Sequence, residues 1–247
     1  MIPILVFWSL LLTDSLASVV QTPERLTGNE GAPGVWGVLE VPQAPGPHAG
    51  VVVLHGSAGW RPLYAEVARS FADSGFVALA LDYYAETGGA AIGSSEKLEK
   101  WPTWMETIQN AVAYVRELPG VSNLPVGLIG YSRGAFLAVS VAGSTSGVHA
   151  VVDFYGGGGG GTKTIEDEAT NFPPLLILHG EADDVVPVRF AQNLRDAVLA
   201  KGGPVEIHIY PDVGHAFNAP YASTYSELAA QDAFGRTIAF LRIHLRN

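Results

Sequence analysis

The chain has 247 residues, of which 48% are hydrophobic, and a formal net charge of -10. A chain of this length can bury one large core, and single α/β domains of this size are common. The acidic balance and the lack of basic runs argue against a nucleic-acid partner and against stable association with an anionic membrane. We expect the partner to be a small molecule and the protein to be a monomer or homodimer.

Cysteine is absent from the sequence. Its absence excludes disulfides, a thiolate nucleophile and cysteine-ligated zinc. The seven histidines are scattered, without the HxxxH or HExxH spacing that is typical of metal sites. We therefore predict no metal site and no cofactor.

Residues 1–24 contain an apolar run, and Ser15-Leu16-Ala17 offers small residues where a signal peptidase would cut. The run is too short to span a membrane, and no Lys or Arg precedes it. A cleaved signal peptide predicts a secreted or periplasmic protein, whereas a buried N-terminal segment predicts a cytoplasmic one, and both stay open. Residues 25–247 are expected to form a single domain.

Short, nearly continuous apolar runs predict strands that are buried on both faces of a parallel sheet. In chain order they are Val35–Val41, Gly50–His55, Phe76–Leu81, Val126–Gly130, Val148–Tyr155 and Pro174–His179. Apolar residues spaced by three and four predict helices between them. These helices are Tyr64–Phe71, Thr107–Leu118, Ala135–Ala142 and Phe190–Leu199.

The chain closes with an alternating run, Val205–Tyr210, that predicts an edge strand, and with an amphipathic helix over Ser226–His244. The alternation of strands and helices predicts an α/β fold with a mostly parallel, doubly wound sheet flanked by helices. The segment Gly156–Gly161 consists only of glycine and predicts a flexible loop.

In an open α/β sheet, ligands bind beyond the carboxyl ends of the strands, so functional residues should lie just after the apolar runs. The chemically capable residues at those positions are His55, Gly56, Asp82, Ser132, Asp153, His179, Asp183, Asp184 and His215.

The sequence Gly130-Tyr131-Ser132-Arg133-Gly134 lies between a predicted strand and a predicted helix. A sharp turn there would hold the serine in a strained conformation, with its hydroxyl above the sheet. Side chains at the two flanking glycines would collide across such a turn. We interpret Ser132 as a nucleophile, with a structural serine as the alternative.

A serine nucleophile needs a base within hydrogen-bond reach, and a carboxylate must orient that base. His215 lies in a glycine-containing loop beyond a strand end and is the best candidate for the base, the alternative being a surface histidine. Asp183 is our choice for the acid. The alternatives Glu181, Asp184 and Asp153 would be solvated, cap a turn or bond to neighbouring backbone.

The tetrahedral intermediate of acyl transfer needs N–H donors for its oxyanion. The N–H of Arg133 lies at a helix N-terminus, directly after the nucleophile. The loop His55-Gly56-Ser57 follows an early strand, from which the second donor normally comes. We assign that donor to the N–H of Ser57, and His55 is then a positioning residue.

The motifs GYSRG, HGEADDVVP and YPDVGHAF, in this order after LDYYAE, make the sequence resemble the dienelactone hydrolase family of α/β-hydrolases. The resemblance runs from about residue 34 to the C-terminus, and it implies a single α/β-hydrolase catalytic domain with a Ser-His-Asp triad. The spacing HG-x-x-D-x-x-V-P supports Asp183 over Asp184. The inserted segments before Ser132 are short, which leaves no room for a large cap domain.

Three departures from the family bear on the substrate. Ser132 stands where dienelactone hydrolases carry cysteine, and Gly56 stands where they carry an acidic residue. Their two substrate-binding arginines correspond to Glu86 and Ala219, so a substrate carboxylate loses both partners and meets a negative charge. A carboxylesterase for small or short-chain neutral esters is therefore the favoured function.

Large side chains near the strand ends are expected to wall the substrate pocket, with core packing as an equal alternative for each aromatic. The substrate-binding candidates are Trp60, Tyr84, Glu86, Trp104, Tyr155 and Phe217. Dienelactone hydrolysis, or thioesterase or peptidase activity on the same triad, remains an alternative. A non-catalytic binding protein on a hydrolase fold is the alternative of another class.

Overall fold

The computed structural model describes residues 24–26, 35–87, 94–121, 124–161, 164–168 and 171–246. The predicted N-terminal segment, residues 1–24, lies outside the described residues except for Glu24. None of the helices in these ranges combines the length and apolar content needed to cross a bilayer.

The described residues form an eight-stranded sheet with the order β1-β2-β4-β3-β5-β6-β7-β8. The strands are β1 Glu24–Leu26, β2 Val35–Glu40, β3 Gly50–Leu54, β4 Val77–Leu81, β5 Val126–Tyr131, β6 Ala150–Phe154, β7 Leu175–Gly180 and β8 Val205–Tyr210. Strands β4, β3, β5, β6, β7 and β8 run parallel, and β1 and β2 pair antiparallel at one edge. This confirms the mostly parallel sheet and the edge position of β8.

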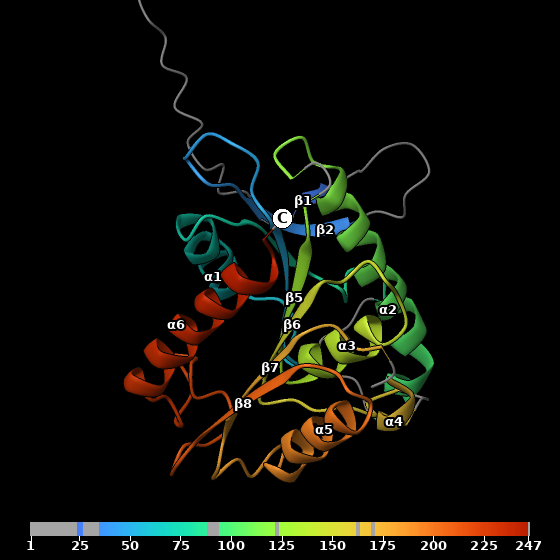
Figure 1. Cartoon of the computed structure of the whole chain (residues 1–247), viewed down its shortest axis with the longest axis vertical. Helices are drawn as coiled ribbons and strands as arrows, with labels where there is room; N and C mark the ends of the chain where they lie inside the picture. Colours follow the sequence, from blue (N-terminus) through green and yellow to red (C-terminus); the bar gives the residue numbers. More distant parts are fainter. Residues whose placement is uncertain are drawn as a thin grey trace, which may run out of the picture.

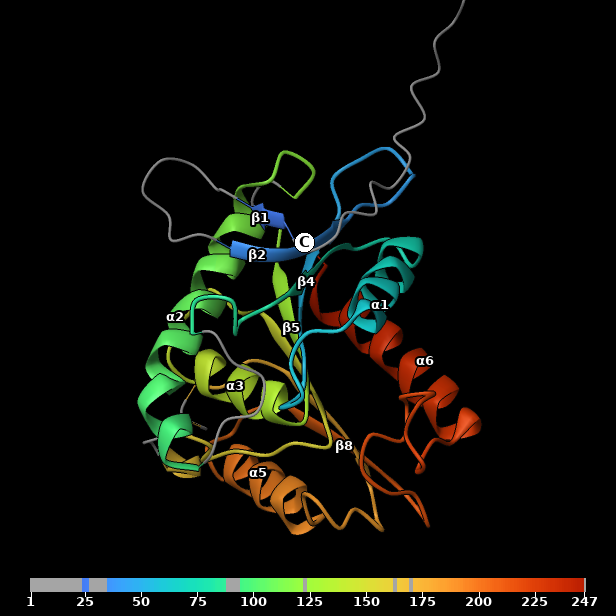
Figure 2. The ribbon, with the colours of Figure 1, turned by 180° about the vertical axis from the view of Figure 1, so that it is seen from behind.

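Helices cover both faces of the sheet, as Figures 1 and 2 show from opposite sides. The helices are α1 Pro62–Asp73, α2 Ser94–Glu117, α3 Arg133–Ala142, α4 Ile165–Glu168, α5 Arg189–Ala200 and α6 Glu227–His244. Helices α1 and α6 pack on one face, and α2, α3 and α5 pack on the other. The helices on each face form a separate apolar core with the strands. Central strands such as β3 are buried along their whole length, which explains their continuous apolar runs.

The sequence did not predict β1, α4 or the first half of α2. The pattern of α2 is interrupted by Pro102 and diluted by charged residues near Ser94, so its helical period was recognisable only from Thr107 onward. Trp101 and Trp104 are nevertheless buried in the core beneath this part of the helix. Tertiary packing therefore supports the helix where its sequence pattern is weak.

The glycine segment after β6 is packed against helices, so the prediction of a flexible loop is wrong. Gly156, Gly157 and Gly160 are buried. A Cβ at Gly156 would lie 2.4 Å from the Cβ of Ala135, and one at Gly160 would lie 2.7 Å from the Trp101 ring. Glycine is required here because the backbone passes so close to α3 and α2 that no side chain fits.

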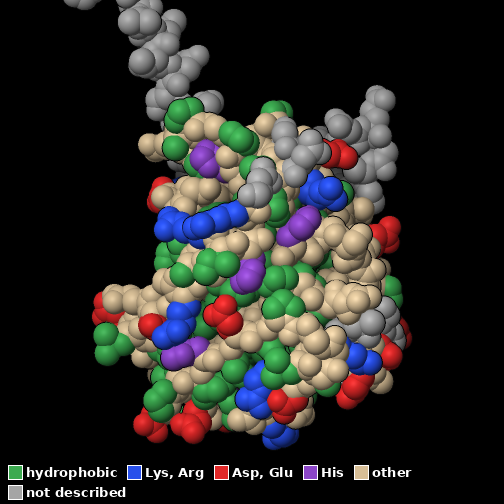
Figure 3. All heavy atoms as spheres, viewed as in Figure 1, with side chains coloured by type: hydrophobic (Ala, Val, Ile, Leu, Met, Phe, Trp, Pro, Cys, Tyr) green, Lys and Arg blue, Asp and Glu red, His purple; other side chains and the backbone are tan. Residues whose placement is uncertain are grey.

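The face in Figure 3 shows acidic and basic side chains interspersed rather than gathered into a field of one sign. This mixture fits the expectation from the net charge that no extended basic surface for a polyanion is present on this face.

Candidate active site

The chain turns sharply at Ser132, between β5 and α3. Ser132 has φ 54° and ψ -117°, a conformation that is strained for a residue with a side chain. A Cβ at Gly130 would lie 2.3 Å from the carbonyl oxygen of Gly134, and a Cβ at Gly134 would lie 2.5 Å from that of Leu54. Both glycines are therefore required by the close approach of backbone to backbone, as the sequence pattern predicted.

Two hydrogen bonds join Ser132, His215 and Asp183. The Oγ of Ser132 lies 3.0 Å from Nε2 of His215, and Nδ1 of His215 lies 2.7 Å from Oδ2 of Asp183. Because the carboxylate can only accept, Nδ1 carries the proton and Nε2 is left free to accept from the serine hydroxyl. The imidazole is thus held in the tautomer that a general base needs.

Asp183 is buried and fully hydrogen-bonded. Its Oδ1 accepts the N–H groups of Val185 at 3.0 Å and Val186 at 2.8 Å. Burial alone would raise the pKa of Asp183, but hydrogen bonds from His179 and His215 outweigh it and hold the pKa well below its ordinary value. The carboxylate therefore stays ionised at neutral pH.

The alternative acids lie elsewhere. Glu181 and Asp184 are exposed, in agreement with the solvated role foreseen for them. Asp153 is fully buried and accepts the N–H of Gly156 at 2.7 Å, as the backbone-bonding alternative predicted. Burial raises the pKa of Asp153 to about 6, which the charge of nearby His179 only partly offsets.

A second histidine supports the acid loop, and its role was not predicted, although the strand-end position of His179 was noted. His179 is fully buried, and its Nε2 lies 2.8 Å from the carbonyl oxygen of Val186 and 3.4 Å from Oδ2 of Asp183. Both neighbours are acceptors, so Nε2 carries a proton. Burial would lower the pKa of His179, but Asp183, Val186 and the charge of Asp153 together raise it.

The loop after β3 approaches Ser132 from the other side. A Cβ at Gly56 would lie 3.7 Å from the Cβ of Ser132. Within the part of the chain that the structure describes, the N–H groups of Ser57 and Arg133 bond to no protein acceptor. Both are therefore available for the oxyanion role expected of them.

His55 contacts this loop and the residues that follow β4. Its Nδ1 lies 2.8 Å from the carbonyl oxygen of Gly56, and its ring stacks on Tyr83 with centroids 4.0 Å apart. The side chain is fully buried, which fits a positioning residue rather than a base.

Two of the expected pocket walls need correction. Trp104 and Phe217 are both 0% exposed, so neither side chain can touch a substrate in this structure. Phe217 packs between Tyr155 and Tyr210 in the core, and Trp104 lies beneath Tyr84. For these two aromatics the core-packing alternative is right.

Tyr155 and Trp60 remain candidates for the pocket wall. The rings of Tyr155 and His215 form a T-shaped pair with centroids 4.8 Å apart, and the Tyr155 hydroxyl donates to Asn218 at 2.8 Å. Trp60 is half-buried. Tyr84 is 4% exposed, as is Tyr155, and its hydroxyl is bonded to Arg133.

Glu86 and Ala219, the positions at which the resemblance implied arginine in related enzymes, differ in exposure. Glu86 is exposed and accepts a hydrogen bond from Nε1 of Trp36 at 3.3 Å. Ala219 is buried. A role for Glu86 in substrate binding stays a prediction.

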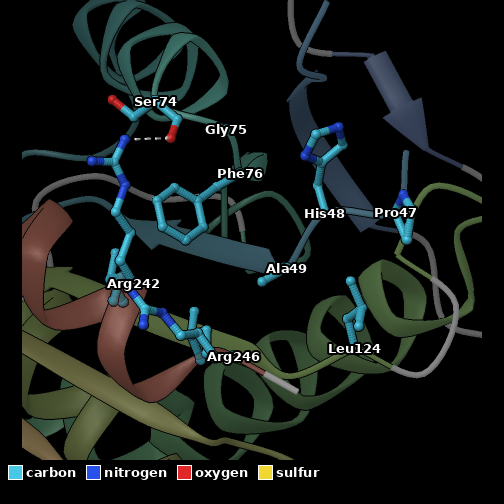
Figure 4. Close-up of a pocket in the computed structure, with 11 residues that line it drawn as sticks. Pro47, His48, Ala49, Ser74, Gly75, Phe76, Leu124, Arg242 and Arg246 are labelled. Atoms are coloured by element: carbon cyan, nitrogen blue, oxygen red, sulfur yellow. Dashed lines mark hydrogen bonds between the residues drawn. The ribbon is translucent and has the colours of Figure 1, made fainter. Parts of the chain in front are cut away.

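A cavity of about 330 Å³ lies at the amino-terminal ends of the parallel strands, away from Ser132 (Figure 4). Ala49, Phe76 and Leu124, which line it, precede β3, β4 and β5, whereas Ser132 follows β5. Arg242 borders the cavity and donates to the carbonyl of Ser74 at 3.2 Å. None of the predicted site residues lines it, and among the described residues no cluster of His, Asp or Glu could hold a metal ion.

Known proteins resemble this chain over most of its length. Residues 35–245 match the model of the dienelactone hydrolase family. A "Putative carboxymethylenebutenolidase" of Methylorubrum extorquens is 28% identical over 216 residues, covering 79% of this chain and 72% of the relative. The protein usf of Aquifex pyrophilus is 29% identical over 223 residues, covering 85% of this chain and 94% of the relative.

Solved structures share the fold. A dienelactone hydrolase-like promiscuous phosphotriesterase from metagenomic libraries has a TM-score of 0.76 at 23% identity and covers 91% of this chain and 99% of its own. An esterase of Thermogutta terrifontis has a TM-score of 0.67 at 17% identity, with 90% and 93% covered. Both likenesses show the α/β-hydrolase fold without a large cap. Because the family model spans most of its length, the chain belongs to the dienelactone hydrolase family and is a hydrolase of the esterase type.

Proposed function

We propose that the protein is a carboxylesterase that cleaves small or short-chain neutral esters through an acyl-enzyme on Ser132. The observation that carries this proposal is the pair of hydrogen bonds from Ser132 through His215 to Asp183. A serine hydroxyl becomes a useful nucleophile only with such a base and orienting carboxylate.

The reaction is two acyl transfers. Ser132 Oγ attacks the ester carbonyl while Nε2 of His215 takes the hydroxyl proton, and Asp183 stabilises the imidazolium. The N–H groups of Ser57 and Arg133 bind the oxyanion, and its collapse expels the alkoxide, which takes the proton from His215. Water then attacks the acyl-enzyme, with the same histidine as base, and releases the acid.

The substrate class follows from charge and space. Glu86 and Ala219 stand where a carboxylate-binding family member has arginines, which disfavours an anionic dienelactone. The described residues include no large cap over the strand ends, which favours substrates with short acyl chains. A neutral ester with a short acyl group meets both conditions.

The test is hydrolysis of p-nitrophenyl acetate, butyrate and longer esters by the parent enzyme and by Ser132→Ala. Loss of the nucleophile should lower kcat by about four to six orders of magnitude. A loss of tenfold or less would exclude Ser132 as the nucleophile. Faster turnover of a dienelactone, a thioester or a peptide than of p-nitrophenyl butyrate would replace the proposed substrate class.

A further inference from the structure

Tyrosine hydroxyls hold the loop of residues 55–57 that carries one proposed oxyanion donor. The hydroxyl of Tyr83 donates to the carbonyl oxygen of His55 at 2.9 Å, and the hydroxyl of Tyr64 accepts the N–H of Gly56 at 2.9 Å. Both tyrosines are buried, so these bonds are shielded from competing water. Two successive residues of the loop are thus tied to the core.

A third tyrosine extends this arrangement to the nucleophile turn. The hydroxyl of Tyr84 accepts a hydrogen bond from a guanidinium nitrogen of Arg133 at 2.7 Å and lies 3.4 Å from the carbonyl oxygen of Ser57. Since Arg133 can only donate, the proton of Tyr84 is free to point at Ser57. The charged guanidinium also polarises the Tyr84 phenol, which strengthens the hydrogen bond that the phenol donates to Ser57.

The Arg133 side chain is committed to this contact. Its guanidinium lies over the ring of buried Trp104, 5.8 Å from the ring centroid. No carboxylate of the described residues forms an ion pair with it. Trp104 therefore serves as the platform on which the guanidinium faces Tyr84, which gives this fully buried ring a role other than substrate contact.

We propose that Arg133 and Tyr84 are positioning residues that join the two halves of the oxyanion hole. The backbone N–H of Arg133 is one donor, and its side chain, through Tyr84, fixes the carbonyl of the residue whose N–H is the other donor. The link sets the spacing between the two donors, because it runs from the residue that carries the first to the residue that carries the second. Donors fixed in advance stabilise a developing oxyanion without the cost of reorganisation.

The inference rests on the proposed function and is tested with Tyr84→Phe and Arg133→Met, which keep the backbone donors. The matched control is Tyr210→Phe, which removes a different hydroxyl bond, that to Asp232 at 2.8 Å. Two quantities are measured: kcat and KM for p-nitrophenyl butyrate, and Ki for a short-chain trifluoromethyl ketone. With this ketone, Ser132 Oγ bonds to the carbonyl carbon, the carbonyl becomes an oxyanion, and the hydroxyl proton passes to His215.

Each single variant should lower kcat by about tenfold, well short of the ~100-fold cost of losing a donor outright, and should raise Ki by a similar factor with KM unchanged. The double variant should lose no more than either single variant, because both changes cut the same chain of bonds. Tyr210→Phe should leave Ki unchanged.

Three outcomes would each overturn the link: an unchanged Ki in both single variants, a loss explained by KM alone, or losses that multiply in the double variant. The last two are what direct contact between Arg133 and the substrate would produce. If the parent enzyme neither cleaves the ester nor binds the ketone, the proposed function fails. If it does both and the variants behave as the parent, only the oxyanion link fails.

Discussion

Nε2 of His179 lies 3.4 Å from Oδ2 of Asp183, and the same oxygen accepts the hydrogen bond from Nδ1–H of His215. The carboxylate thus has backbone donors on one oxygen and two imidazoles on the other. Contacts on both oxygens oppose rotation of the carboxylate away from His215.

Loss of the His179 donor should slow the chemical step. His179→Leu fills a similar volume without an N–H, and we expect kcat to fall by about 10- to 100-fold while KM changes by less than about twofold. His179→Gln retains an amide donor and should restore most of the rate. Steady-state kinetics and the low-field proton resonance of the His215 Nδ1–H report the two effects, and an unaltered resonance in His179→Leu would contradict this role.

Substitutions of Asp183 and Asp184 should have very different effects on kcat. Asp183→Asn can keep the bonds from Val185 and Val186, but it places an amide against Nδ1 of His215 and favours the wrong tautomer. We expect kcat to fall by about 10,000-fold. Asp184→Asn alters an exposed side chain and is the matched control, with a rate near that of the parent. Equal losses in the two variants would show that the acid has been misassigned.

The buried carboxyl of Asp153 should make stability depend on pH. Its pKa is raised by burial to about 6 in the folded state, from 3.8, so the folded protein binds a proton that the unfolded chain has released. The free energy of unfolding therefore decreases as pH rises from about 4 to 6 and then levels off, a loss of up to about 3 kcal/mol.

Asp153→Asn, which resembles the protonated form, should remove this loss. Chemical denaturation at pH 4 and pH 8 should show the variant more stable than the parent at pH 8 and similar at pH 4. Asp184→Asn serves as the exposed control. A gain that is equal at both pH values would contradict the titration of Asp153.

Two glycine substitutions should act in opposite directions. A Cβ at Gly156 would lie 2.4 Å from the Cβ of Ala135, so Gly156→Ala should lower the free energy of unfolding by about 1–3 kcal/mol. Gly235 lies in α6, and a Cβ there would meet no atom within 4 Å beyond the helix's own backbone, so Gly235→Ala should raise stability by about 0.5–1 kcal/mol. Thermal melts of both variants check the pair, and a neutral Gly156→Ala would refute the close packing of the glycine segment.

The sequence by itself determined the parallel strands, the sharp turn at Ser132 and the loops that carry Asp183 and His215. Buried parallel strands require continuous apolar runs, and a sharp strand-to-helix turn requires glycines on both sides of Ser132. Short sequence segments therefore specify these features. Tyr83 and Tyr84 lie just beyond the end of β4, and the sequence already placed Tyr84 near the site, although as a substrate-binding residue. Tyr64 lies in α1, where nothing in the local pattern points to the site.

Only the tertiary structure decided which side chains meet. The contacts of Arg133 with Tyr84, of His179 with Asp183, and of the glycine segment with α3 all join segments that the sheet order brings together. The same holds for Trp104 and Phe217, which lie fully inside rather than at the pocket wall. Local propensity fixes where a strand or turn forms, but partners distant in sequence depend on how the layers pack.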